Sequence, residues 1–289
     1  MRSRLRAHMS LAYLLTPGVI AGSLLAGCSD DANDTPDAAP PIDAPVACTA
    51  DLPDPLPSAA GDVSGTWGLF SKYFSNAQGL SGSQISRSYY LQEYVQNGEE
   101  LTVTETLCDI AIDAPTAGTS IRLGPGFAAA QPQVTRAGTI IAGIDSYEFS
   151  LELTYVARGV DLADVVDEEL PTDPADPRVL DPDNDGNPGL TLLLDGILSG
   201  QLFEVQRDFT ELTGTQTSAD RIEGLARWGS ELSYLGADPE FLLDVVGEAL
   251  PDSDPNKHTF EIVRLPPGSD CSYILENRCS LYTTIEGNE

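Results

Sequence analysis

Alternation of apolar and polar side chains along the chain predicts β-strands. In the clearest run large apolar side chains occupy every second position, with polar side chains between them: Tyr147, Phe149, Leu151, Leu153 and Tyr155. A period of two puts successive side chains on opposite faces of a strand, one buried and one facing water. The same spacing recurs at Phe203, Val205 and Phe209, and at Phe260 and Ile262.

Turn signals between these runs predict antiparallel hairpins. Asn97-Gly98 joins strand-like runs at 88–96 and 99–110, and Asn-Gly is typical of a two-residue hairpin turn. Residues 213–215 separate the runs 201–212 and 221–234 in a similar way. Antiparallel hairpins can bury one face and leave the other in water. We therefore expect a mostly β fold, an antiparallel barrel or sandwich built of hairpins.

Helical signals are few. Asp238 and Pro239 fit the start of a helix over 240–250, which Pro251 would end, because proline is tolerated only in the first turn. A shorter helix is expected around 162–170. The sequence thus predicts one or two short helices beside the strands.

Composition divides the chain into three parts. Residues 1–27 are expected to be a signal peptide, described below. Residues 28–47 contain five Asp and four Pro with almost no large apolar side chain; such a segment buries too little surface to fold, and we expect an extended acidic tether. Residues 48–289 can form a substantial core, and are expected to be one antiparallel β domain with a long acidic loop at 171–189.

The charge balance excludes some partners. The chain has 45 acidic and 15 basic residues, a net charge of −30. Such a surface repels nucleic acid and anionic headgroups and attracts cations. We expect no nucleic-acid partner, and we expect most single carboxylates to face water.

The first 28 residues carry an export signal. Arg2, Arg4 and Arg6 precede an apolar stretch that ends in Leu25-Ala26-Gly27-Cys28. A basic start, a short apolar core and small residues at the cut are typical of a secretory signal, and the stretch is too short for a membrane span. The ending resembles the lipobox of bacterial lipoproteins. The resemblance implies cleavage before Cys28, lipidation of its thiol and anchoring of the protein to a membrane of the cell envelope. Ser29 rather than Asp follows, which in that family favours the outer membrane.

Four further cysteines are expected to form disulfides: Cys48, Cys108, Cys271 and Cys279. An even number in an exported chain is typical of disulfides, with three possible pairings. The simplest joins Cys271 to Cys279 in a local loop and Cys48 to Cys108. A zinc site is disfavoured, because there is no Cys-x-x-Cys pair and only one histidine, His258, follows the signal.

One motif suggests a metal. Asp181, Asp183 and Asp185 alternate ahead of Gly186, which resembles the opening of the EF-hand calcium loop. The resemblance implies Ca²⁺ held by the three carboxylates and the backbone carbonyl of Asn187. Position twelve is Leu192 instead of Glu, and 190–194 suggests a strand, so the helical frame is missing and a closing acid would come from elsewhere, Asp176 or Asp195. The alternative is an acidic surface loop without metal. We expect a structural Ca²⁺.

Two arginines share the register of apolar strand positions, Arg207 and Arg264. A buried arginine needs a partner, so these either reach water at strand ends or anchor one end of a barrel. Gly65-Thr66-Trp67 opens the first strand-like stretch and resembles the Gly-x-Trp start of lipocalins. In that family the tryptophan packs against an arginine of a late strand, which implies Trp67 with Arg264.

No catalytic motif is evident: the chain has no Gly-x-Ser-x-Gly, His-Glu-x-x-His or Walker loop. His258 is expected to be an exposed residue before a strand rather than a general base. We therefore expect a non-enzymatic binding or interaction module for an unidentified small molecule or protein. The alternative is a hydrolase of envelope or external polymers, which needs only two carboxylates.

Overall fold

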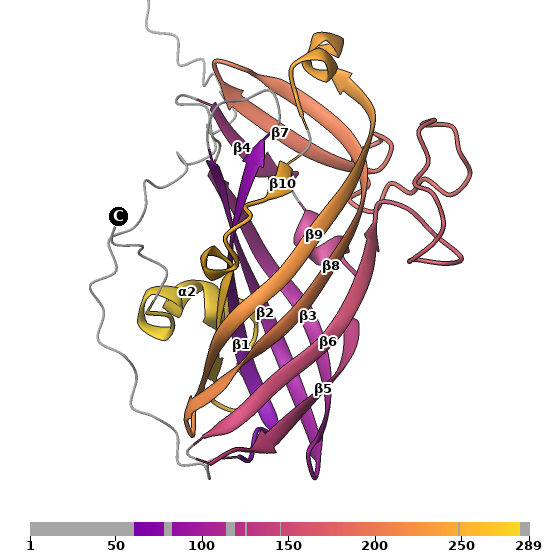
Figure 1. The fold of residues 1–289 in the computed structure, drawn as a ribbon. Helices are drawn as coiled ribbons and strands as arrows, with labels where there is room; N and C mark the ends of the chain where they lie inside the picture. Colours follow the sequence, from indigo (N-terminus) through magenta and orange to yellow (C-terminus); the bar gives the residue numbers. More distant parts are fainter. Residues whose placement is uncertain are drawn as a thin grey trace, which may run out of the picture. The chain divides into compact units, whose positions relative to one another are not determined.

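A single antiparallel sheet, closed into a ring, dominates the fold (Figure 1). The computed structural model describes residues 61–77, 83–113, 119–124, 126–144, 146–247 and 249–283. Within these residues eight strands pair in chain order and the last pairs with the first. They are β1 (Gly65–Ala77), β2 (Ser83–Asn97), β3 (Glu100–Asp113), β5 (Val134–Ala142), β6 (Tyr147–Arg158), β8 (Gly200–Ser218), β9 (Arg221–Asp238) and β11 (Thr259–Arg264). The antiparallel β prediction is confirmed, and the closed ring makes the fold a barrel rather than a sandwich.

Several predictions concern residues outside these ranges. They are the signal peptide at 1–27, the lipidation of Cys28 and the tether at 28–47. In the part of the chain that the structure describes, none of the helices is long and apolar enough to cross a bilayer.

Three short strands extend one end of the ring, which we call the open end. They are β4 (Thr119–Leu123), β7 (Leu190–Gly196) and β10 (Ala249–Pro251). β4 pairs with β7, β7 pairs with the first residues of β8, and β10 pairs with the last residues of β1. Figure 1 shows all three at the top of the barrel. They lengthen the wall only at this end.

The opposite end, which we call the closed end, is filled by side chains. Its buried core includes Trp67, Tyr94, Leu101, Val103, Ile140, Phe149, Leu151, Leu212, Ile222, Phe260 and Ile262. Gly214 and Gly224 lie opposite each other on β8 and β9. A Cβ atom at either position would lie 2.9 Å from the ring of Phe260, closer than real side chains pack. The two glycines therefore make room for this ring.

The alternation in β6 is interrupted, which corrects the sequence prediction. Leu151 lies opposite Leu212 of β8, but the next paired residue, Thr154, lies opposite Thr210. β6 thus has one residue more than its partner, a β-bulge, and the side chains that follow exchange faces. Leu153 is 37% exposed, although the regular pattern would bury it. Thr154, Val156 and Arg158 line the barrel interior instead.

Both predicted hairpins form, with their turns displaced. β2 and β3 join at Gly98 and Glu99, one residue later than expected, and Gly98 has a positive φ of 66°. β8 continues through Gly214 to Ser218 and turns at Ala219 and Asp220. Gly214 therefore serves packing inside the hairpin, and not the turn.

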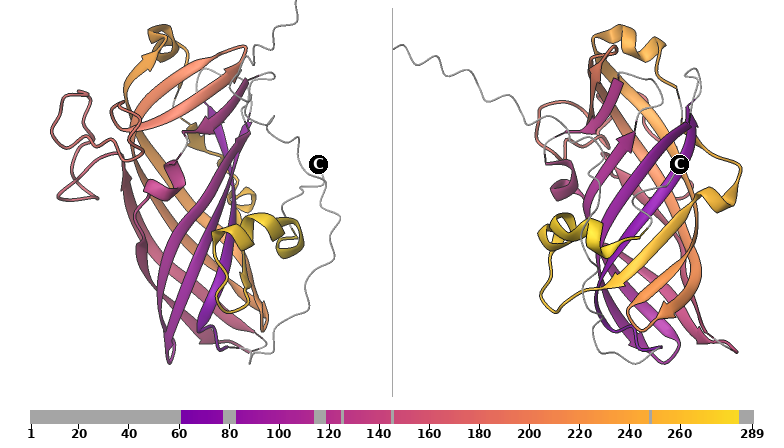
Figure 2. Two further views of the ribbon diagram at one scale, coloured as in Figure 1. Left: turned by 180° about the vertical axis from the view of Figure 1, so that it is seen from behind. Right: turned by 90° about the vertical axis from the view of Figure 1, so that its left-hand side faces the viewer.

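The expected small number of short helices is confirmed, but both predicted positions are wrong. Residues 240–250 form only a 3₁₀ turn, η1 (Glu240–Asp244), before β10, and residues 162–170 form turns. The longest helix, α2 (Cys271–Leu281), was not predicted; Asp270 caps it by accepting a hydrogen bond from the Tyr273 backbone N–H. It lies outside the barrel (Figure 2) and packs on Phe70 and Val263. The remaining short helices are α1 (Phe127–Ala130) and η2 (Pro255–Lys257).

The disulfide that the structure describes corrects both predicted pairings, Cys271 with Cys279 and Cys48 with Cys108. Cys271, at the start of α2, is bonded to Cys108 of β3, with 5.1 Å between their Cα atoms. Residues eight positions apart in a helix are separated by about 12 Å, whereas a disulfide spans at most about 7 Å. Cys279 is also disulfide-bonded. The bond ties α2 to the barrel wall.

The segment between β6 and β7, residues 159–189, covers part of the outer wall and includes the predicted acidic loop. Val160 and Leu170 pack on the outward side chains Val205 and Leu235. Arg207 also points outward here and donates to the backbone carbonyls of Val165, Val166 and Glu168 at 3.2, 3.0 and 2.7 Å. The face of β8 that carries Val205 and Arg207 is therefore covered by this segment and does not point into the barrel.

Candidate functional site

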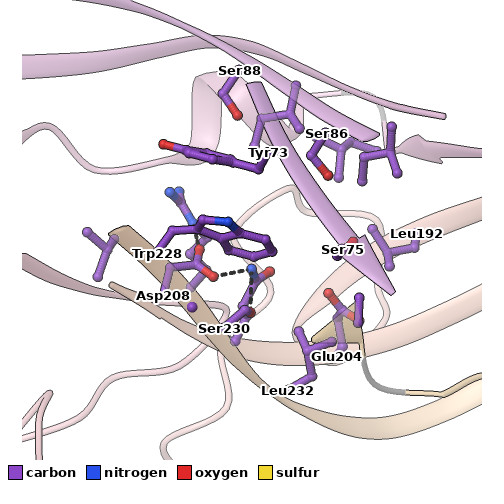
Figure 3. A pocket seen from close by; sticks show the side chains of 18 of the residues that line it. Tyr73, Ser75, Ser86, Ser88, Leu192, Glu204, Asp208, Trp228, Ser230 and Leu232 are labelled. Carbon is purple, nitrogen blue, oxygen red and sulfur yellow. Dashed lines mark hydrogen bonds and ion pairs between the residues drawn. The ribbon is translucent and has the colours of Figure 1, made fainter. Parts of the chain in front are cut away.

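The barrel interior contains a cavity of about 240 Å³ toward the open end (Figure 3). Its walls come from strands of the ring and from β4 and β7. The inward positions of these strands carry both apolar and charged side chains. From the closed end outward, the lining changes from aromatic to charged and then to apolar.

Two stacked aromatic rings form the floor. The rings of Tyr73 and Trp228 lie 5.2 Å apart, and the Trp228 Nε1–H donates to Nδ1 of His258 at 3.0 Å. Nε2 of His258 therefore carries the proton and donates to the backbone carbonyl of Asp252 at 2.9 Å. His258 is 5% exposed, so the expectation of an exposed histidine is wrong. Both ring nitrogens are occupied, which leaves none to act as a base.

A buried ion pair lies beside the floor. Arg136 Nη1 is 3.3 Å from Glu105 Oε1, which also accepts a 2.6 Å hydrogen bond from Gln92. Arg136 further donates to the carbonyl oxygens of Glu152, in the β6 bulge, and Thr210, both at 3.1 Å. The arginine thus neutralises one carboxylate and stabilises the irregular backbone of the bulge.

A second ion pair lies farther toward the open end. Arg158 Nε is 2.9 Å from Asp208 Oδ2, and Arg158 Nη1 donates to Gln131 at 2.7 Å. Gln206 donates to Asp208 and to Ser230, the latter at 3.1 Å. Figure 3 shows Asp208 and Ser230 on the same side of the cavity. Asp208 is therefore held by donors on two strands, β6 and β8.

Glu204 differs from these two acids. It is 3% exposed, and its Oε2 has no hydrogen-bond partner among the described residues. Its side chain lines the cavity (Figure 3). Burial, and then the nearby negative charge of Asp208, raise the pKa of Glu204 to about 8. The carboxyl group is therefore mostly protonated at neutral pH.

The rim of the cavity at the open end is apolar. It is formed by side chains of β4, β7, β8, β9 and their connections, including Ile121, Leu123, Leu192, Leu194, Leu198, Leu202, Leu232 and Val246. An apolar cavity with a few placed polar groups is the usual form of a small-molecule site. The arrangement suits a molecule with a hydrocarbon part and a polar group.

The predicted metal loop brings its three acids together. Ligand oxygens of Asp181, Asp183 and Asp185 lie within 4.8 Å of one another. Gly186 has a φ of 87°, the left-handed conformation that its place in the motif predicts, and Asn184 has a φ of 56°. Asp181 accepts the backbone N–H of Asp185 at 3.2 Å and of Gly186 at 3.0 Å. The loop backbone is thus folded around one carboxylate.

The central acid of the loop has no hydrogen-bond partner. Both carboxylate oxygens of Asp183 are buried without one among the described residues. Desolvation, and then the charge of Asp185, raise the pKa of Asp183. Asp185 is also desolvated, but hydrogen bonds from Thr191 (2.5 Å) and Asn187 (2.8 Å) lower its pKa overall. Three close carboxylates with one unpartnered member are the arrangement that a bound cation stabilises.

The two acids suggested to close the site are not part of the cluster. Asn187 donates its backbone and side-chain N–H groups to Asp185. Asp176 and Asp195, suggested as closing acids, instead form ion pairs with Arg178 (2.8 Å) and Arg122 (3.1 Å). Among described residues the acidic cluster has three members, fewer than the six to eight oxygens Ca²⁺ takes unless carbonyls or water complete the shell.

Trp67 and Arg264 meet at the closed end, as the lipocalin resemblance implied. The guanidinium carbon of Arg264 is 4.2 Å from the centroid of the Trp67 ring, and the two residues are paired between β1 and β11. Arg264 also donates to the Ser64 carbonyl at 2.8 Å and forms a 3.3 Å ion pair with Asp220. The contact closes this end of the barrel.

Sequence reasoning missed the charged residues of the cavity: Glu105, Arg136, Arg158, Glu204 and Asp208. Glu105 lies at every-second-residue spacing with Val103 and Leu107, and Glu204 with Leu202. A charged residue at a position where the alternation predicts an apolar side chain was therefore a signal that could have identified these residues. Arg207 also follows an apolar alternation in the sequence, but its side chain faces the segment outside the barrel.

Comparisons with known proteins give no relative: no family model, no curated protein and no solved structure matches this chain. The function is therefore inferred from the site itself.

Proposed function

We propose that this protein is a binding module that holds a small amphiphilic molecule inside its barrel. The single observation that carries the proposal is the cavity at the open end, with an apolar rim above buried polar groups. A closed barrel of eight strands is wide enough for side chains to fill it or for one small ligand. Here side chains fill the closed end, and space remains at the other.

A fold-level likeness supports the same function. Up-and-down barrels of eight strands include the lipocalins, and the packing of Trp67 on Arg264 matches the arrangement that the Gly-x-Trp resemblance implied. A shared fold does not establish a shared ligand. The likeness therefore supports binding in the barrel, and the nature of the ligand has to come from the cavity.

The location and the metal belong to the proposal as well. The lipobox-like ending at Cys28 supports a lipid-anchored protein of the cell envelope, in the outer membrane. The cluster of Asp181, Asp183 and Asp185 supports a structural Ca²⁺ that holds the start of β7 at the open end. Calcium would there fix the cavity wall and take no part in chemistry.

The alternative function, a carboxylate-dependent hydrolase, has less support. Such an enzyme needs two carboxyl groups with distinct roles at a set separation. Of the three acids that line the cavity, Glu105 and Asp208 are ion-paired with arginines. Among the described lining residues, no unpaired carboxylate therefore remains to act together with Glu204.

The two tryptophans provide the test. Trp228 lies at the cavity floor, and Trp67 is buried at the closed end. We expect brominated decyl amphiphiles, an amine, an alcohol or a carboxylate, to quench the fluorescence of Trp228 saturably. The full chain would carry Cys28→Ser, so that no lipid or detergent competes. Trp67→Phe should keep the quenching and Trp228→Phe should lose it. Absence of saturable quenching with all three amphiphiles would show that the cavity does not bind such molecules.

A further inference from the structure

The acidic residues that line the cavity outnumber the arginines. Three acids, Glu105, Glu204 and Asp208, face two arginines, Arg136 and Arg158. Each arginine is already paired with one acid, at 3.3 and 2.9 Å. Glu204 is the acid left over, and no lysine or histidine is among the described lining residues.

The immediate surroundings of Glu204 supply no positive charge. Across the sheet it is paired with Leu190 of β7 and Tyr234 of β9. Its neighbours on the inward face of β8 are Leu202 and Gln206, and the amide of Gln206 is used by Asp208 and Ser230. The titratable groups that face it are therefore Asp208 and Tyr234, while β1, β7 and β10 contribute uncharged Ser75, Leu192 and Ala249 to the cavity.

An unpartnered carboxyl group in such a place has a cost. A buried polar group without a hydrogen bond costs about 1–3 kcal/mol, and a buried charge without a partner costs more. Native proteins contain few such groups, and each has a physical reason, such as a bound water, ion or ligand. Because the side chain points into a cavity, a ligand can supply the missing partner.

We propose that Glu204 binds the ammonium group of an amphiphilic amine whose hydrocarbon chain lies along the apolar rim. This inference rests on the proposed function and specifies its ligand class. An ammonium group brings one positive charge and up to three N–H donors, which balance the charge of the ionised Glu204 and satisfy its Oε2. A carboxylate ligand would instead add a negative charge beside Glu204 and Asp208 with no arginine free to pair with it.

The surface charge acts in the same direction. A net charge of −30 raises the local concentration of cations and lowers that of anions. Amphiphilic amines therefore reach the open end more readily than fatty acids do.

Binding of an ammonium ion should release a proton. Glu204 is mostly protonated when the cavity is empty, because its pKa is raised to about 8. The incoming ammonium favours the carboxylate, so the carboxyl proton leaves to water and an ion pair forms. Below pH 8 the affinity should therefore rise about tenfold per pH unit, and level off above it.

The experiment compares three probes of equal chain length, decylamine, decanol and decanoate, by titration calorimetry on the full chain carrying Cys28→Ser. We expect decylamine to bind at least tenfold more tightly than the other two at pH 8. Between pH 6 and 8 its affinity should rise by roughly 50-fold, with up to one proton released, as measured in buffers of different ionisation enthalpy.

Glu204→Gln separates the charge from the shape of the site. The variant should lose at least tenfold in decylamine affinity at pH 8, lose the pH dependence and keep decanol binding. Glu93→Gln, which removes an exposed acid of β2, is the matched control and should behave as the wild type.

The outcomes are distinguishable. If decanol or decanoate binds and decylamine has no advantage, the amine inference is wrong while the proposed function stands. If none of the three binds, both are wrong. If Glu204→Gln does not fold, the pH profile and proton release of the wild type decide: a flat profile without proton release contradicts the role of Glu204.

Discussion

The two ends of the barrel are built by the same strands but are filled in different ways. At the closed end the inward positions carry large apolar side chains, and Trp67, Phe149 and Phe260 leave no space among them. Toward the open end the inward positions of β6 and β8 carry Arg158, Asp208 and Glu204 around a cavity. The closed end therefore provides most of the packing stability, and the open end keeps polar groups that packing alone would not select.

The largest expected effect concerns two buried acids with opposite roles. Glu204 has a pKa of about 8 in the folded protein, against an ordinary 4.5. Because the folded state binds the extra proton, stability falls as pH rises from about 4.5 to 8, by about 4 kcal/mol. Glu204→Gln should match the wild type near pH 4 and exceed its free energy of unfolding by about 4 kcal/mol at pH 8, measured by urea denaturation.

Glu261 is the control for this prediction. It is also buried, but it is paired with Arg221 and accepts two hydrogen bonds from Thr283. Glu261→Gln should lower stability at pH 8, since it removes the buried carboxylate that is paired with Arg221. The same sign for both substitutions would contradict the contrast drawn here.

The next effect compares one substitution at the two ends. Leu151 is fully buried in the closed-end core, whereas Leu232 borders the cavity. Leu151→Ala should cost about 3 kcal/mol, because it opens a new cavity in a filled core. Leu232→Ala should cost about 1 kcal/mol, since its side chain already lies against empty space. Denaturation at pH 5 measures both, and equal losses would mean that the two ends are packed alike.

The smallest effect concerns calcium, which should stabilise only the open end. Removing it with a chelator should lower the melting temperature by several degrees, about 1–2 kcal/mol, and increase amide hydrogen exchange in β4 and β7. Exchange around Trp67 should not change. Asp183→Asn should abolish the calcium effect, whereas Asp173→Asn, at an exposed site of the same segment, should keep it. Identical amide hydrogen exchange with calcium and with chelator would show that the loop binds no structural calcium.

The sequence predicted the strands well because period-two alternation is a local property. Tyr147–Leu151 and Phe260–Ile262 do belong to strands, and Trp67 does meet Arg264. The alternation could not reveal which face is inside the barrel. Val205 and Arg207 follow the pattern of a buried face, but they are buried by residues 159–189. This segment is separated from β8 along the chain by β7, so a local pattern could not identify it.

The candidate site was harder to predict for a related reason. Its charged residues come from β3, β5, β6 and β8, and their pairing depends on register across strands that no short window contains. The Asp181–Asn187 motif was visible because all its acids lie within seven residues. The disulfide was mispredicted since Cys271 and Cys279 are near in sequence, yet a helix holds them apart.

The bulge after Leu151 has a consequence for how this barrel can vary. One additional residue exchanges the faces of everything that follows in β6, so the interior polarity there depends on how the strand accommodates that residue. If β6 continued past Leu151 in regular alternation, Tyr155 and Ala157 would turn inward and Arg158 would leave Asp208. A single-codon deletion between Leu151 and Thr154 would instead straighten the strand and keep Thr154, Val156 and Arg158 inward, so the interior charge tolerates the loss of this residue.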